Sequence, residues 1–239
     1  GDLRAAIYVV DGDMAAKLSR KSVLGNAPVE WIKTPAKLPR LVQGDLGAGL
    51  DSFCDAKGLP SQEPKFTIGA NIAGDKQPEK VMILDRYVVA QGPAIGGPDA
   101  YAYNKLGVSD ADAVTSLVAK ELTGDKKQEV VITFREEHAG TTREWIEIYQ
   151  VSPELAFELV FSAATRVEQG SVLIENSYKF VRGKGKRKAI ELRAGRVEGV
   201  TAETIEGNVP DEGGNPMVLP WDKPTKRKYQ YQGGSFVAD

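Results

Sequence analysis

A nine-residue segment occurs twice in this chain, and the two copies begin 50 residues apart. The first copy reads Asn71-Ile-Ala-Gly-Asp-Lys-Gln-Pro-Glu79, and the second reads Glu121-Leu-Thr-Gly-Asp-Lys-Lys-Gln-Glu129. Each copy leads directly into an apolar segment of β-strand composition, residues 80–84 in the first and 130–134 in the second. Because loop and apolar segment recur together, the pattern indicates an internal repeat in which a polar loop precedes a strand.

Most of the chain after the second copy favours antiparallel β-structure. Alternating apolar residues at 130–134 and large apolar side chains at 143–151 predict two strands joined by a turn at 137–141. Large apolar residues occupy every second position from 155 to 161, which predicts a strand with one buried face; they are Leu155, Phe157, Leu159 and Phe161. The glycines in Arg182-Gly-Lys-Gly-Lys-Arg187 predict a hairpin. We therefore expect at least one four-stranded antiparallel sheet between Val114 and Leu192.

Residues 110–122 fit two structures. Val114, Leu117, Val118 and Leu122 have helical spacing, and Ser109 or Asp110 is a suitable N-cap. The repeat, however, aligns this stretch with residues 65–69, which have strand composition. The repeat therefore favours a strand over residues 114–121.

The remaining segments complete the predicted domain organisation. Residues 5–10 predict a buried strand, 50–54 a helical turn and 91–99 a long surface loop. Residues 228–236 predict a closing hairpin anchored by Tyr229, Tyr231 and Phe236 around Gly233-Gly234. We expect an N-terminal segment, 1–60, packed on a β domain, 61–239, with repeat units at about 65–108 and 114–205.

The acidic loop before a strand resembles the FG-GAP or VCBS repeat of β-propellers and integrin-like extracellular domains. The resemblance implies a mainly β fold with antiparallel sheets resembling β-propeller blades and few short helices. The terminal Tyr229-x-Tyr231-x-Gly233-Gly234-x-Phe236 pattern also resembles the end of bacterial envelope lipoproteins with degenerate repeats of this type.

In the FG-GAP family the loop reads roughly Asp-x-Asp-x-Asp-Gly-x-x-Asp and often holds calcium, which takes six to eight oxygen ligands. Both copies here place a lysine, Lys76 or Lys126, where the family has glycine at the sharp turn. We therefore expect vestigial loops without a cofactor, in which Asp75 and Asp125 accept hydrogen bonds from backbone N–H groups. Calcium is the alternative. The resemblance assigns its ligands in the second copy to Glu121, Thr123, Asp125 and Glu129, and the first copy offers Asn71, Asp75 and Glu79.

Composition excludes several classes of protein. The chain has 239 residues and a formal net charge of −2, which gives no long-range attraction to nucleic acid. No apolar run approaches the ~20 residues of a transmembrane helix.

The first residues, Gly1-Asp2, lack an initiator methionine, which suggests a removed leader. We expect an exported monomer, periplasmic or at the cell surface, with a lipid anchor as an option.

Catalytic residues are not evident, so the question of enzyme activity stays open. His138 is the only histidine, and neither an orienting carboxylate nor a nucleophile can be named for it. Cys54 lies between Asp51 and Asp55, whose charges disfavour a reactive thiolate. The sequence thus favours a non-catalytic binding or structural module of the bacterial envelope. A hydrolase with an unrecognised carboxylate/His site is the alternative.

Two basic runs, 182–188 and 226–228, are the strongest charge clusters. Flanking strands and glycines make the first run typical of a solvated hairpin tip. The other interpretation is that it binds an anionic envelope polymer or lipid surface, and an envelope protein or polymer is the expected partner.

Overall fold

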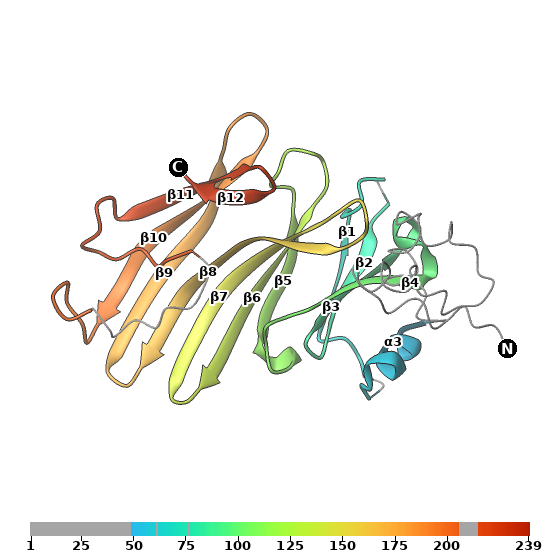
Figure 1. The fold of residues 1–239 in the computed structure, drawn as a ribbon, viewed down its shortest axis with the longest axis horizontal. Coiled ribbons are helices and arrows are strands. Elements are labelled where there is room, and N and C mark those ends of the chain that lie inside the picture. The colour runs from blue at the N-terminus through green and yellow to red at the C-terminus, as the bar shows by residue number, and fades with distance from the viewer. Residues whose placement is uncertain (1–48, 61, 76, 206–214) are drawn as a thin grey trace, which may run out of the picture.

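The computed structural model describes residues 49–60, 62–75, 77–205 and 215–239 (Figure 1). These residues form a mainly β protein with one antiparallel sheet of four strands, another of eight, and one short α-helix. Their strands make neither a closed sheet nor a ring of propeller blades. The strand predicted at residues 5–10 lies outside the described residues.

The four-stranded sheet consists of consecutive strands paired in chain order. They are β1 (Phe66–Ala70), β2 (Glu79–Leu84), β3 (Tyr87–Gly92) and β4 (Gly97–Lys105). Helix α3 (Gly49–Lys57) packs on this sheet through Phe53, whose ring lies 5.6 Å from that of Tyr87 and 5.9 Å from that of Tyr101 between centroids. The helical turn predicted at 50–54 is confirmed.

The surface loop predicted at 91–99 is wrong. Strand β3 runs to Gly92, a 3₁₀ turn occupies Pro93–Ile95, and β4 already begins at Gly97. Ile95 is buried in the core, which explains why an apolar residue stands inside this Gly/Pro-rich stretch.

The eight-stranded sheet is a meander in which every strand pairs with its sequence neighbours. Figure 1 shows these strands as a twisted fan that extends away from the smaller sheet. Its strands are β5 (Val114–Lys120), β6 (Glu129–His138), β7 (Thr141–Val151), β8 (Phe157–Gln169), β9 (Val172–Arg182), β10 (Lys188–Glu198), β11 (Lys226–Gln232) and β12 (Ser235–Ala238). The predicted antiparallel sheet between Val114 and Leu192 is confirmed.

Two large clusters of buried side chains cover the two faces of strand β6. Val130, Ile132 and Phe134 belong to a core shared with the four-stranded sheet. Val131 faces the second cluster, to which β8, β10 and the C-terminal hairpin contribute. Because the first half of β6 is buried on both faces, Val130, Val131 and Ile132 are consecutive apolar residues and do not alternate with polar ones.

The internal repeat corresponds to two hairpins with the same register. Ala70 pairs with Glu79 in the β1–β2 hairpin, and Lys120 pairs with Glu129 in the β5–β6 hairpin. The strand interpretation of 114–121 is therefore confirmed for residues 114–120. The helical signal before it has a local source, because Asp110 caps a 3₁₀ turn at Ala111–Ala113 by accepting a hydrogen bond from Asp112 N at 2.8 Å.

The predicted alternation of residues 155–161 fails at Leu159. Ile148 pairs with Phe161 and Tyr149 pairs with Leu159, so Val160 is an extra residue in a β-bulge. Leu159 is 52% exposed, while both Val160 and Phe161 are buried. A bulge moves the following side chains to the other face, which is why the strict period of two is lost.

The closing hairpin is confirmed. Strands β11 and β12 pair around Gly233-Gly234, and both glycines have positive φ. Tyr229 and Phe236 are buried and contact Phe161 with ring centroids 5.1 and 6.1 Å away. No helix in the described part of the chain is long and apolar enough to cross a membrane.

Candidate functional site

The two copies of the repeated segment form loops, 71–78 and 121–128, that a buried glutamate closes in the same way. Glu129 Oε2 accepts a hydrogen bond from Leu122 N at 2.7 Å, and the matching Glu79 Oε2 accepts from Ile72 N at 3.0 Å. Both glutamates are fully buried at the first position of the second strand. Each carboxylate thus satisfies backbone N–H groups that would otherwise be lost in the turn.

The rims of the two loops also match. Asp75 Oδ1 accepts from Gln77 N at 3.0 Å, and Asp125 Oδ1 accepts from Lys127 N at 2.9 Å. These are the backbone hydrogen bonds predicted for Asp75 and Asp125. Gly74 and Gly124 have φ of 88° and 84°, a conformation that glycine adopts without strain.

The lysine of the second loop occupies the turn position where the FG-GAP family has glycine. Lys126 has a φ of 74°, which is uncommon for a residue with a Cβ.

One side chain distinguishes how the two loops bond their buried glutamates. In the second loop, the Thr123 hydroxyl donates to Glu129 Oε1 at 2.9 Å. The matching residue of the first loop is Ala73, and Glu79 Oε1 is buried without a hydrogen-bond partner among the described residues.

Burial also changes the ionisation of Glu129. Desolvation raises its pKa from 4.5 to about 7, with a smaller contribution from the negative charge of Asp125. Hydrogen bonds from Leu122 and Thr123 act in the opposite direction but do not outweigh burial.

The four residues assigned to calcium lie in one loop, but their oxygens are directed to different partners. Thr123 and Glu129 contact each other, while Glu121 Oε1 accepts from Gly124 N at 2.6 Å and Asp125 bonds Lys127. Within the described ranges, no group of three or more His, Cys, Asp or Glu side chains is placed to hold a metal ion. In this arrangement the oxygens of the four residues do not converge on one calcium position.

The two loops lie against each other. Asn71 N donates to Gln128 Oε1 at 2.8 Å, and Gln128 N donates to Asn71 O at 2.8 Å. These bonds join the two copies of the repeat and, with them, the two sheets at one end of the molecule.

The basic hairpin between β9 and β10 is attached to the second loop. Lys188 N donates to Leu122 O at 2.8 Å. Arg187 Nη1 donates to Tyr231 O at 3.0 Å, and its guanidinium lies 5.8 Å from the centre of the Tyr231 ring. The hairpin is therefore held to the loop on one side and to β11 on the other.

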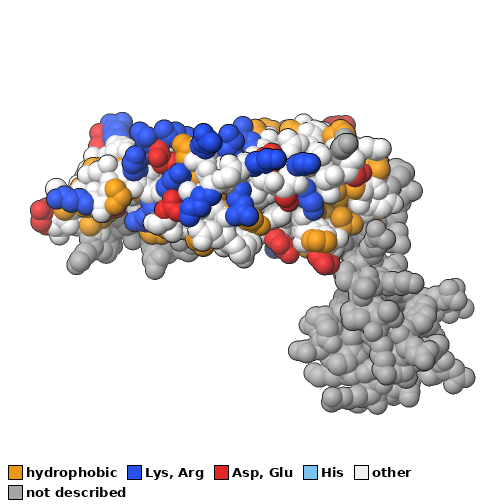
Figure 2. Space-filling model, turned by 90° about the horizontal axis from the view of Figure 1, so that it is seen from above, with side chains coloured by type: hydrophobic (Ala, Val, Ile, Leu, Met, Phe, Trp, Pro, Cys, Tyr) orange, Lys and Arg blue, Asp and Glu red, His pale blue; other side chains and the backbone are white. Residues whose placement is uncertain are grey.

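Cations of the second loop and of the hairpin consequently occupy one surface, which we call the basic loop surface. All are exposed except the half-exposed Lys127. Figure 2 shows Lys and Arg side chains gathered over the molecule as seen from this end. In the described part of the chain none of these side chains forms an ion pair with a carboxylate. The surface consists of Lys126, Lys127, Arg182, Lys184, Lys186, Arg187 and Lys188.

The second basic run lies in a different environment. Lys226 is 4.0 Å from Glu191, which also pairs with Arg193 at 2.7 Å and Lys179 at 3.3 Å. Arg227 donates to Pro216 O at 3.3 Å. The structure therefore joins run 182–188 to the second loop and leaves run 226–228 outside the basic loop surface.

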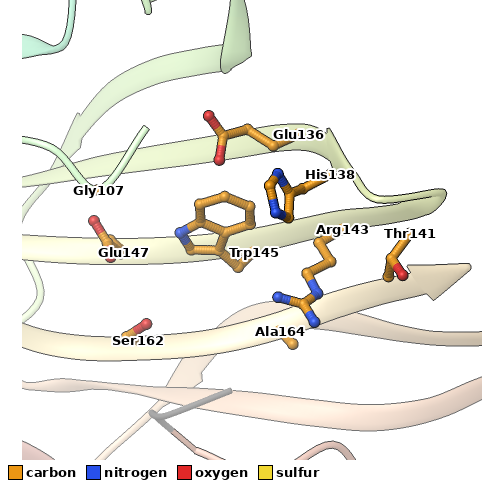
Figure 3. Close-up of a pocket in the computed structure, with 9 residues that line it drawn as sticks. All are labelled: Gly107, Glu136, His138, Thr141, Arg143, Trp145, Glu147, Ser162 and Ala164. Atoms are coloured by element: carbon orange, nitrogen blue, oxygen red, sulfur yellow. The ribbon is translucent and has the colours of Figure 1, made fainter. Parts of the chain in front are cut away.

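His138 lies at the opposite end of β6, in a pocket of about 290 Å³ (Figure 3). The walls come from β6, β7, β8 and the connection after β4, so residues far apart in sequence meet there. The lining residues are Gly107, Glu136, His138, Thr141, Arg143, Trp145, Glu147, Ser162 and Ala164.

Trp145 is at the centre of this pocket and is fixed by its neighbours. Its ring stacks on Phe134 at 5.2 Å between centroids. Glu147 lies beyond the indole nitrogen and accepts a hydrogen bond from the Tyr149 hydroxyl at 2.5 Å. Burial raises the pKa of Glu147, opposed by hydrogen bonding from Tyr149 and Trp145.

The chain matches no protein-family model, no curated protein and no solved structure.

Sequence reasoning did not identify the pocket. Its only local signal is the alternation of Thr141, Arg143, Trp145 and Glu147, which places four functional side chains on one face of one strand. The thiol of Cys54 is buried in the core, so burial limits its reactivity more than its acidic neighbours do.

Proposed function

We propose that this protein is an exported, non-catalytic binding module of the bacterial cell envelope, and that the basic loop surface binds an anionic polymer. The observation that carries the proposal is the joining of the basic hairpin to the second loop by the Lys188–Leu122 hydrogen bond. This bond makes one surface from two clusters that are about 60 residues apart in the sequence.

The cations of this surface are available to a ligand. Cations that already pair with a carboxylate, as Lys179 and Arg193 do with Glu191, gain little from a second anion. Those of the basic loop surface have no such partner among the described residues and outnumber the carboxylates of the loop, Glu121 and Asp125, so an approaching phosphate or carboxylate meets a net positive field.

The surface is also supported by the fold. Arg187 is tied to Tyr231, and the second loop is tied to the first through Gln128. Lys184 and Lys186 project from the hairpin tip beside this anchored base. A preorganised base lowers the entropy lost when several weak charge contacts form together.

A long anionic polymer fits these features better than a membrane does. The cations follow two hydrogen-bonded turns, and among the described residues the exposed large apolar side chains, Val118, Leu159 and Val237, lie outside these turns. We also propose a likeness to FG-GAP repeats and their propeller blades, which the two matching hairpins support. Export to the periplasm or cell surface follows from this likeness. A full gene that encodes no export leader would contradict the proposed export.

The test compares two double variants with the same loss of charge. Lys184→Gln/Lys186→Gln removes two cations from the basic loop surface, and Lys226→Gln/Lys228→Gln removes two from the other basic run. We expect the first to weaken binding to polyphosphate and poly-γ-glutamate at low salt at least about tenfold, and the second to change it little. Equal effects of the two variants would contradict the proposal. Stronger binding to phosphatidylglycerol vesicles than to either polymer would contradict the choice of a polymer.

A second candidate function is a hydrolase, because the pocket places His138 with two carboxylates and Ser162. A histidine and a carboxylate in one pocket are the usual elements of general acid–base catalysis. A screen of ester, glycoside, peptide and phosphate substrates tests it. Turnover that His138→Ala abolishes would establish this function, and its absence across the screen would leave the binding module as the better account.

A further inference from the structure

The pocket around Trp145 combines an aromatic ring with polar groups of mixed character. Figure 3 shows Glu136 and His138 on one side of the indole and Arg143 and Ser162 on the other. Trp145 is only partly buried, so the ring forms part of the pocket surface as well as part of the core.

The polar groups offer both kinds of hydrogen bond. Glu136 keeps one carboxylate oxygen in position by accepting from Ser109 N at 2.5 Å, and its other oxygen has no hydrogen bond within the described residues. Arg143 supplies N–H donors at the pocket wall, and His138 and Ser162 can each donate and accept. A ligand that fits must therefore carry groups that donate and accept around its edge.

Charge excludes two classes of ligand. Two carboxylates, Glu136 and Glu147, disfavour a phosphate or another strong anion. Arg143 in the same wall disfavours a compact cation. A ligand without net charge is left.

Size limits the ligand further. At about 290 Å³ the pocket is at the lower end of the range for small-molecule sites, which begins at ~300 Å³. Exposed residues at its rim, Gly107 and His138, leave it open to solvent. The end of a longer molecule can enter as well as a free small one.

We propose that this pocket binds one ring of a neutral sugar, free or at the end of a glycan, stacked on Trp145 with its hydroxyls bonded by Glu136 and Arg143. A sugar ring has an apolar face of C–H groups that matches an indole and a rim of hydroxyls that both donate and accept. The site lies at the opposite end of β6 from the basic loop surface, so it is independent of polymer binding there.

The experiment is saturation-transfer NMR and calorimetry with a panel of neutral hexoses, deoxyhexoses and N-acetylhexosamines. Glucose 6-phosphate serves as the anionic comparison. We expect at least one neutral sugar to bind, and glucose 6-phosphate to bind more weakly than glucose.

Two variants locate the binding, each with a matched control. Trp145→Leu removes the stacking ring, and Trp221→Leu removes a tryptophan outside the pocket. Glu136→Gln keeps an oxygen for Ser109 N, so the fold is preserved, and Glu144→Gln makes the same change on the other face of β7. The pocket variants should weaken binding at least tenfold and the controls less than twofold. Failure of every neutral sugar to bind, tighter binding of glucose 6-phosphate, or equal effects of variants and controls would each overturn the proposal.

Discussion

At the scale of single residues, the two loops differ most at the position occupied by Ala73 and Thr123. Thr123 gives the buried Glu129 Oε1 a donor, while Glu79 Oε1 has none among the described residues. A buried polar atom without a hydrogen bond costs about 1–3 kcal/mol. The same fold thus contains a satisfied and an unsatisfied version of one loop.

This difference predicts opposite effects of two substitutions. Thr123→Val keeps the shape of the side chain but removes the donor, and should lower the free energy of unfolding by about 1–2 kcal/mol. Ala73→Thr should raise it by up to ~1 kcal/mol, because Ala73 is half-exposed and a hydroxyl there can reach Glu79. Urea unfolding measures both. A stabilising Thr123→Val, or a strongly destabilising Ala73→Thr, would contradict the hydrogen-bond account.

Glu129 predicts how stability depends on pH. Its folded-state pKa, about 7, is above the ordinary 4.5, so the native state holds this proton more tightly than the unfolded chain. The stabilisation is complete below about pH 4.5 and is lost as pH rises through about 7, by at most ~3 kcal/mol. Burial of Glu147 acts with the same sign.

The measurement is the melting temperature of the wild type and of Glu129→Gln at several pH values from 5 to 8. The wild type should melt at a lower temperature as pH rises, and the variant should show a clearly smaller slope. Glu168 and Glu191, whose pKa values are lowered, titrate below this window and do not mask the effect. Equal slopes in the two proteins would show that Glu129 is not the titrating group.

At the scale of elements, each repeat hairpin holds its loop by internal hydrogen bonds. Adding millimolar calcium should therefore leave the melting temperature unchanged. Asp125→Ala alone should destabilise by about 1 kcal/mol, because Lys127 N loses its acceptor. A bound ligand at 100 times its dissociation constant would instead add ~2.7 kcal/mol. A rise in melting temperature with calcium that Asp125→Ala abolishes would show a working metal site.

The elements also show what sequence patterns can predict. The repeat loops, the basic hairpin and the closing hairpin were predictable, because glycines with positive φ and Asx turns are local chemistry. The exposure of Leu159 was not predictable, because a bulge depends on the register of β8 with β7. The 91–99 segment failed for a similar reason, since burial of Ile95 depends on packing between sheets and overrides its glycines and prolines.

At the scale of the whole molecule, the important contacts join segments far apart in the chain. The mainly β class followed from alternation and turns. The contact of Asn71 with Gln128, however, required the two sheets to be placed, and that of Leu122 with Lys188 required two distant hairpins of the eight-stranded sheet to meet. The pocket likewise needs three strands in register. Local patterns carry no information about such pairings, so neither the basic loop surface nor the pocket could be derived from the sequence alone.

The most direct test of the account is an NMR titration of the isotopically labelled protein with polyphosphate at low salt. Binding at the basic loop surface should shift the amide signals of residues 122–128 and 182–188, leave those of β7 around Trp145 in place, and weaken as salt screens the charges. Shifts centred on the pocket, shifts spread evenly over the molecule, or no shifts at all would contradict it.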